Sequence, residues 1–436
     1  MTKRRVVLAT FGSLGDLHPM LAVGLRLRAV GAEVVVASSE GHRAKVEAEG
    51  LDFAPVRPDF ADIERDLGVE PAEAMRRVIA GDDFLFREVL FPYVRRSYED
   101  SLAAIAGADL VAGTNFAFGA RIAAEVRRLP YVALVLQPLT FLSAYDPPVI
   151  LPYPLLGSLP TKVGPRGAEL FFNLVRQATT SWAGPLQRLR RELGLPPERD
   201  PIFTGQFSRA ERALGLYSPL LGASQPDFPA CAEIVGSTFY DSEAGGPDRL
   251  PPELERFLNA GSPPVVFTLG SAAVLQGESF YRHSLAAARS LGLRSVLLVG
   301  ADAAPRWTDA VGGDAIAVAY AAHSLLFPRA AAVVHHGGIG TTAQALRAAR
   351  PQLVIPFFAD QPDNAQRLVR LGVARTLPSR RYTAKRAAAE LGALLADPEH
   401  ARAAGSTAAV IAREDGAGRA AAAILAVLER SAVVAA

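Results

Sequence analysis

Residues 330–364 constrain the possible fold more than any other stretch of the chain. The apolar run 331–334 has the length and the boundaries of a buried parallel strand. Glycines, which permit the backbone of a tight turn, follow it at Gly337, Gly338 and Gly340. A helix over 343–350 and an apolar strand over 353–355 complete the pattern. The stretch therefore predicts a strand, a glycine turn, a helix and a second strand of one parallel sheet.

The ends of this helix carry their own signals. Thr341 or Thr342 can cap its N-terminus, and Pro351 stops it before the next strand. The unpaired amides and the positive end of the helix dipole then face the carboxyl end of the sheet, where a phosphate group would be held. His336 lies at that mouth.

The first forty residues predict a similar unit. An apolar strand is expected over 6–10, followed by a loop over 11–18 and a helix with Pro19 in its first turn. Gly31 ends that helix, and 33–37 forms the next strand, as in a right-handed crossover between parallel strands. A nicotinamide site is weakly supported, because the loop has only two glycines of the Gly-x-Gly-x-x-Gly fingerprint.

The whole chain is predicted to be an α/β protein. Its 436 residues, 50% of them hydrophobic, suffice for two sizeable cores. Buried strands over 108–113 and 131–136 extend the first sheet into a doubly wound one, and prolines and glycines concentrate between Gly222 and Pro264. The expected divisions are a first domain over 1–222, a linker region over 223–264, a second domain over 265–412 and a final helical segment over 413–436.

Composition excludes several classes of function. A net charge of +2 over this length gives no single-sign field for nucleic acid. Cys231 is the only cysteine, so no internal disulfide and no cysteine-based zinc site is expected. The N-terminus has no signal-peptide core and no apolar run reaches about 20 residues, so we expect a cytoplasmic protein without a transmembrane segment. Phosphate-loop, zinc-hydrolase and serine-hydrolase motifs are missing, as is the Asp-x-Asp of metal-dependent sugar transfer.

Two parts of residues 330–364 carry a family resemblance: His-His-Gly-Gly-Ile-Gly-Thr-Thr at 335–342 and Asp-Gln-Pro-Asp-Asn at 360–364. They resemble the donor motif of nucleotide-sugar-dependent glycosyltransferases, the superfamily of plant and animal UDP-glycosyltransferases and of bacterial sterol, macrolide and glycopeptide glycosyltransferases. The resemblance implies the GT-B fold, two Rossmann-like doubly wound parallel-sheet domains that face each other across a cleft. It also implies that the last helix packs back on the first domain.

The resemblance implies a donor site with three parts. His336 and the amides and hydroxyls that follow it would bind the diphosphate, beside an interdomain Gly-Ser turn. Asp360 and Gln361 would bind the sugar hydroxyls. Gln344 stands where the plant motif has a ribose-binding glutamate, which leaves dTDP-sugars open beside UDP-sugars. The full donor set is Gly270, Ser271, Tyr320, His323, His336, Gly338, Gly340, Thr341, Gln344, Asp360 and Gln361. The purely structural alternative is that the histidines end a strand and Asp360 caps a turn.

The same resemblance places the general base in the loop after the first strand. Asp16 occupies that position in Gly-Asp-Leu-His-Pro, and His18 is a second candidate two residues away. An exposed aspartate with a pKa near 3.9 is a poor base for an alcohol, so burial must raise its pKa. His18 would need an orienting partner, and Thr114 occupies the position of the aspartate that serves as one in the plant pattern. The alternative for Asp16 is a cap of the following helix.

Two loose, aromatic-rich stretches, 52–98 and 137–165, could line an apolar acceptor cleft. The candidate acceptor-binding residues are Phe84, Phe91, Phe141 and Tyr145. A covered hydrophobic surface under long loops is the equally favoured alternative.

The resemblance and the residues together indicate an inverting, metal-independent hexosyltransferase. It would move a sugar from a UDP- or dTDP-sugar to a hydroxyl of a hydrophobic acceptor such as a natural product, a sterol or a lipid-like aglycone. The nucleotide sugar is a co-substrate, and no cofactor, metal or nucleic acid is expected; the chain should be a monomer or weak homodimer. The alternatives are a nucleotide-sugar 2-epimerase and a non-catalytic sugar-nucleotide-binding partner protein.

Overall fold

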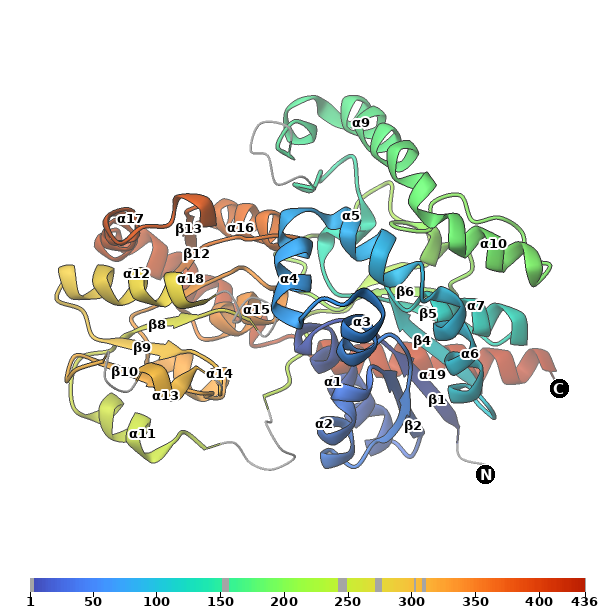
Figure 1. The fold of residues 1–436 in the computed structure, drawn as a ribbon, viewed down its shortest axis with the longest axis horizontal. Coiled ribbons are helices and arrows are strands. Elements are labelled where there is room, and N and C mark those ends of the chain that lie inside the picture. Colours follow the sequence, from blue (N-terminus) through green and yellow to red (C-terminus); the bar gives the residue numbers. More distant parts are fainter. Residues whose placement is uncertain are drawn as a thin grey trace. The chain divides into compact units, whose positions relative to one another are not determined.

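The computed structural model describes residues 4–150, 157–241, 249–270, 277–301, 303–307 and 311–435. They form two compact units (Figure 1). Unit 1 comprises Met1–Tyr240 and Asp415–Ala436, and unit 2 comprises Asp241–Glu414. The predicted fold class, two α/β units with parallel sheets, is confirmed.

Unit 1 is built on a seven-stranded sheet with the order β3-β2-β1-β4-β5-β6-β7 and parallel pairing throughout. Its strands are β1 (Arg5–Ala9), β2 (Glu33–Ser38), β3 (Asp52–Pro55), β4 (Leu110–Thr114), β5 (Tyr131–Val135), β6 (Arg212–Gly215) and β7 (Ala232–Ile234). Every residue of β4 and β5 is buried, as expected for strands of a parallel sheet that is covered on both faces. The strand order reverses between β1 and β4, so this unit has a switch point there.

The helices of unit 1 cover both faces of this sheet (Figure 1). They are α1 (Leu14–Ala29), α2 (Arg43–Ala48), α3 (Phe60–Leu67), α4 (Pro71–Ala80), α5 (Asp82–Phe84), α6 (Val94–Ala104), α7 (Phe118–Arg127), α9 (Gly164–Thr179), α10 (Gly184–Glu192) and α19 (Gly416–Ala435). On one face, Leu8 of β1 and Leu21 of α1 share a buried core with Ile424 and Val427 of α19. The last helix of the chain therefore completes the core of the first unit.

The start of α1 differs from the prediction. The helix begins at Leu14, so the expected loop is shorter and Pro19 lies in the second turn instead of the first. The reason is a capping box: the Ser13 hydroxyl accepts a hydrogen bond from Gly15 N at 3.2 Å, and the Asp16 carboxylate accepts one from Ser13 N at 2.8 Å.

Unit 2 is built on a six-stranded parallel sheet with the order β10-β9-β8-β11-β12-β13. Its strands are β8 (Val265–Thr268), β9 (Ser295–Leu298), β10 (Ala315–Val318), β11 (Ala332–His335), β12 (Gln352–Val354) and β13 (Ala374–Thr376). Successive strand residues enter different cores: Phe267 and Val334 pack in one cluster, whereas Val266 and Val333 pack in the other. Both faces of the sheet are therefore covered, as in a doubly wound fold.

The helices of unit 2 include one inside the region predicted to be a linker. They are α11 (Pro252–Asn259), α12 (Gly277–Ser290), α13 (Ala304–Trp307), α14 (His323–Leu326), α15 (Ile339–Arg347), α16 (Gln361–Arg370), α17 (Ala384–Ala396) and α18 (Pro398–Ile411). Residues 223–264 are thus not a plain connection, since β7 joins the sheet of unit 1 and α11 packs in a core of unit 2 through Leu254 and Leu258. None of the described helices has the length and apolar character needed to cross a membrane.

Candidate functional site

The glycine turn at the carboxyl end of β11 is held by side chains from both sides. Gly337 has a φ of +92°, a conformation that favours glycine, and a Cβ there would lie 2.9 Å from the side chain of Val354. Its N–H donates to His335 Nδ1 at 3.1 Å, and its carbonyl accepts from Asn364 Nδ2 at 2.9 Å. The turn therefore has one fixed conformation at the start of α15.

His336 has one ring nitrogen occupied by the protein. Gly270 N donates to its Nδ1 at 3.1 Å, so the proton of the neutral ring is on Nε2. A Cβ on Gly270 would lie 2.5 Å from Nε2, and a Cβ on Gly338 would also collide with that atom. These two glycines give the ring its space, and they leave an N–H donor beside the first turn of α15.

Burial sets the charge of the neighbouring histidines. It lowers the pKa of His336 to about 3, and the positive forms of His335 and His323 lower it further. Burial also lowers the pKa of His335 and of His323 to about 4 each. All three rings are therefore neutral near pH 7, and His336 acts as a hydrogen-bond donor without a positive charge.

His335 has a structural role, because both of its ring nitrogens bond within the protein. Its side chain is fully buried, and with Nδ1 occupied by Gly337 N its Nε2–H donates to Gln352 Oε1 at 2.8 Å. The two histidines of the motif thus have opposite surroundings, and only His336 has its N–H near the helix start.

The N-terminus of α15 supplies amide donors. Its N-cap is Gly338, which has no side chain to cap the helix, and Thr342 N is the first amide bonded back to Gly338 O, at 2.9 Å. The predicted caps Thr341 and Thr342 instead lie inside the first turn, because the glycine turn leads into the helix four residues earlier than expected. The amides that precede Thr342 are therefore available to an anion.

Asp360 and Gln361 lie at the start of α16 after a strained residue. Ala359 has a φ of +53°, in the left-handed region that costs a non-glycine residue about 1–2 kcal/mol. Asp360 makes no capping bond to the helix, and its Oδ2 accepts from Asn364 Nδ2 at 2.6 Å. Gln361 Oε1 accepts from Phe357 N at 2.9 Å, which orients the amide and leaves Nε2 as its donor group. The arrangement offers an acceptor and a donor side by side, as polyhydroxylated ligands require.

Two residues of the nucleotide part of the predicted donor set, Gln344 and Tyr320, bond Asp241, a residue that the sequence did not indicate. Gln344 Nε2 donates to the carboxylate of Asp241, and the Tyr320 hydroxyl donates to Asp241 O at 3.4 Å. The His323 ring stacks on Phe327 with centroids 4.3 Å apart. Ser271 lies outside the described residues. No sequence signal singled out Asp241, which lies 103 residues before Gln344.

In unit 1, Asp16 and His18 have different environments. Burial raises the pKa of Asp16 to about 6, although hydrogen bonds from Ser13 lower it. The ring of His18 packs against Tyr240 with centroids 4.9 Å apart. Thr114, at the position where an orienting aspartate would stand, bonds Thr10 Oγ1 at 3.1 Å. Asp16 thus caps α1, which is the alternative role that the sequence left open. Its raised pKa also suits a general base near neutral pH.

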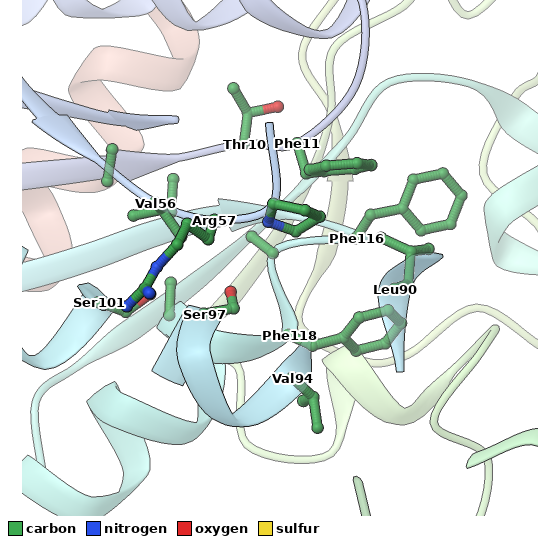
Figure 2. A pocket seen from close by; sticks show the side chains of 15 residues that line it. Thr10, Phe11, Val56, Arg57, Leu90, Val94, Ser97, Ser101, Phe116 and Phe118 are labelled. Atoms are coloured by element: carbon green, nitrogen blue, oxygen red, sulfur yellow. The ribbon is translucent and has the colours of Figure 1, made fainter. Parts of the chain in front are cut away.

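A small cavity lies at the switch point of the first sheet (Figure 2). Its volume of about 20 Å³ has room for a single water. Figure 2 shows side chains from the ends of β1 and β4 and from α6 around it. Thr10, Phe11, Phe116 and Phe118 are among the residues that line it. Phe11 directly follows one predicted strand and Phe116 lies three residues after another, positions that could have drawn attention to them in the sequence.

The four predicted acceptor residues are not brought together. Phe91 is fully buried against Phe118, with ring centroids 5.2 Å apart. Phe141 is also buried and stacks on Phe228 at 4.1 Å. Phe84 packs at the edge of a small cluster that also includes Phe11, whereas Tyr145 is 55% exposed. Phe91 and Phe141 therefore correspond to the covered hydrophobic surface that was the alternative.

A family model, two related sequences and a solved structure all relate this chain to glycosyltransferases of natural-product biosynthesis. A family model described as "Erythromycin biosynthesis protein CIII-like, C-terminal domain" matches residues 295–424. The O-mycaminosyltylonolide 6-deoxyallosyltransferase of Streptomyces fradiae is 32% identical over 409 residues, which cover 90% of each chain. The vancomycin aglycone glucosyltransferase of Amycolatopsis orientalis is 32% identical over 439 residues, which cover 98% of each chain. The solved glycosyltransferase VinC in complex with dTDP has the same fold, with a TM-score of 0.67 at 20% identity over 98% of this chain and 100% of that one.

Proposed function

Because the chain belongs to the glycosyltransferase family of these relatives, we propose that it transfers a sugar with inversion from a UDP- or dTDP-sugar to a hydroxyl of a hydrophobic natural product. The relatives' names support this acceptor class, since two of them act on O-mycaminosyltylonolide and on vancomycin aglycone. The dTDP bound to VinC supports a nucleoside diphosphate donor.

The observation that carries the proposal is the arrangement of His336 at the start of α15. Its neutral ring keeps Nδ1 bonded to Gly270 N and so directs an Nε2–H donor to the place where the helix amides are unbonded. Negative charge grows on the diphosphate as the bond to the anomeric carbon breaks. Fixed donors aimed at that charge stabilise the transition state more than the ground state.

The sugar and the acceptor are held by the remaining residues of the proposal. Asp360 and Gln361 bind the sugar hydroxyls, and Asp16 takes the proton from the acceptor hydroxyl as its oxygen attacks the anomeric carbon. Attack on the face opposite the leaving diphosphate inverts the configuration. The aromatic rings at the switch-point cavity, Phe11 and Phe116, offer an apolar surface near the end of β1, and we place the acceptor over them.

A donor and acceptor screen tests the function. Purified protein is incubated with UDP- and dTDP-hexoses and a panel of hydroxylated macrolides, glycopeptide aglycones and sterols, and products are identified by mass spectrometry. We expect a product whose mass is that of the acceptor plus one hexose, with an anomeric proton coupling that shows inversion, and with turnover unchanged in excess EDTA. Retention of configuration, or activity that EDTA abolishes and Mg²⁺ restores, would contradict the mechanism.

A further inference from the structure

Asp241 gathers the side chains assigned to the nucleotide. Its carboxylate accepts a hydrogen bond from Gln344 Nε2 and forms an ion pair with Arg347 Nη1 at 3.3 Å. Its backbone carbonyl accepts from the Tyr320 hydroxyl at 3.4 Å. Two of these three residues belong to the donor set that the sequence indicated, and all of them lie in unit 2. Asp241 therefore lies inside the region assigned to the base and the ribose.

Gln344 is left with an unused acceptor. Its side chain is 7% exposed, and its Oε1 has no hydrogen-bond partner among the residues that the structure describes. A buried polar atom without a partner costs about 1–3 kcal/mol, so such an atom is a strong indication of a missing donor. Because Asp241 holds the amide nitrogen, the orientation of the amide is fixed and Oε1 is the end left for a ligand hydroxyl.

We propose that Asp241 and Gln344 together form the ribose subsite of the donor nucleotide, with the Asp241 carboxylate in the role that a glutamate at position 344 has in the resembling motif. This inference rests on the proposed function, since it assumes a nucleoside diphosphate donor. The glutamate of the resembling motif and Asp241 would each supply one negative charge. Gln344 itself is neutral, and the Asp241 carboxylate contacts Gln344 and Arg347 on one face of α15.

A carboxylate can accept hydrogen bonds from several donors at once. A carboxylate has about four acceptor positions, so it can bind Gln344 and Arg347 and still accept from a ribose hydroxyl. Arg347 forms an ion pair with the carboxylate, and the bond from the Tyr320 hydroxyl holds the backbone of Asp241. The 3′-hydroxyl is the donor that UDP and dTDP share, and the subsite therefore fits either nucleotide.

Calorimetric titration with deoxynucleotides tests the subsite. The full-length protein is titrated with UDP, dTDP and the 3′-deoxy analogue of whichever binds more tightly. We expect the wild type to bind the parent nucleotide about 10- to 100-fold more tightly than the analogue, as for a hydrogen bond to a charged group. Asp241→Ala should weaken parent binding and bring this ratio close to one. Adding Gln344→Glu to Asp241→Ala returns a carboxylate and should restore most of the ratio.

A matched control separates the subsite from general effects of charge. Glu255 is also an acidic residue of unit 2 that pairs with an arginine, Arg329, at 2.8 Å, and Glu255→Ala should leave the ratio unchanged. Equal binding of parent and analogue by the wild type, or a full ratio in Asp241→Ala, overturns the subsite while the glycosyltransferase proposal stands. Failure of the wild type to bind either UDP or dTDP overturns the donor proposal and this inference with it.

Discussion

At the scale of single residues, the two adjacent histidines of the donor motif differ in what their ring nitrogens bond. His335 uses both nitrogens within the protein, whereas His336 uses only Nδ1 in this way, for Gly270 N. His336→Ala should therefore lower kcat about 10²- to 10³-fold, as when an oxyanion donor is removed, with little change in melting temperature.

His335→Ala is the paired variant, and its expected effect is on stability. It leaves the buried Gln352 amide without a partner, which costs about 1–3 kcal/mol, and should leave most of kcat intact. Kinetics and thermal melts of both variants separate the two roles. Similar losses of kcat in both would mean that the donor to the diphosphate has been assigned to the wrong histidine.

Asp16 gives the reaction its expected pH dependence. Burial raises its pKa to about 6, and a base must be deprotonated, so kcat/KM should rise with pH and level off above about 6. Asp16→Asn should abolish transfer and leave nucleotide affinity within a few fold, whereas His18→Gln should keep much of the activity because its ring packs on Tyr240. The reverse ranking in a single-turnover assay would move the base to His18.

The same pKa makes a prediction about stability. Folding raises the pKa of this carboxyl from 3.8, so the folded protein holds the proton more tightly than the unfolded chain does. Stability relative to Asp16→Asn should therefore fall as pH rises from about 4 to about 6 and stay level above that. Thermal melts of the two proteins across this range measure the difference, and a difference that does not change with pH would contradict the raised pKa.

At the scale of elements, α15 contains a glycine that the fold does not need. A Cβ at Gly340 would meet no atom within 4 Å, unlike one at Gly338, which would collide with His336. Alanine is the better helix former by about 1 kcal/mol, so Gly340→Ala should raise the melting temperature. The added methyl lies on the helix end that would approach the diphosphate, so affinity for UDP and dTDP should fall; unchanged affinity would argue against close approach there.

Elements were the part of the molecule that the sequence predicted best. The strand, the glycine turn, the helix and the next strand form in the predicted order, although the helix begins four residues earlier than expected. Helix ends were less well predicted: α1 begins at Leu14 because Ser13 and Asp16 form a capping box, whereas Pro19 indicated a later start.

At the scale of the whole chain, α19 joins the C-terminal end to the first core. Ile424 is fully buried in that core. Ile424→Ala should cost about 2–5 kcal/mol and should act on unit 1, so hydrogen exchange should rise in its strands and stay unchanged in β8 and β11 of unit 2. The exposed Val410 of α18 is the control, since Val410→Ala removes apolar atoms that are already in water. Faster exchange in both units would show that they unfold together.

Contacts distant in sequence were what the sequence could not predict. Asp241 meets Gln344 across 103 residues, and Thr10 meets Thr114 across 104. The rings of Phe11 and Phe116 at the switch-point cavity come from separate segments in the same way, so local density of aromatic residues does not indicate them. Phe91 and Phe141 lie in aromatic-rich stretches but are buried, because clustered aromatic residues also build hydrophobic cores.

The neutral state of His336 has a practical consequence. The ring that we propose faces the diphosphate stays uncharged down to about pH 3, whereas the proposed base gains its proton near pH 6. Mild acid should therefore slow turnover and leave the nucleotide sugar in place. At pH 4 only about 1% of the base would be ionised, so donor and acceptor could be held together with little reaction and the reaction then started by raising the pH.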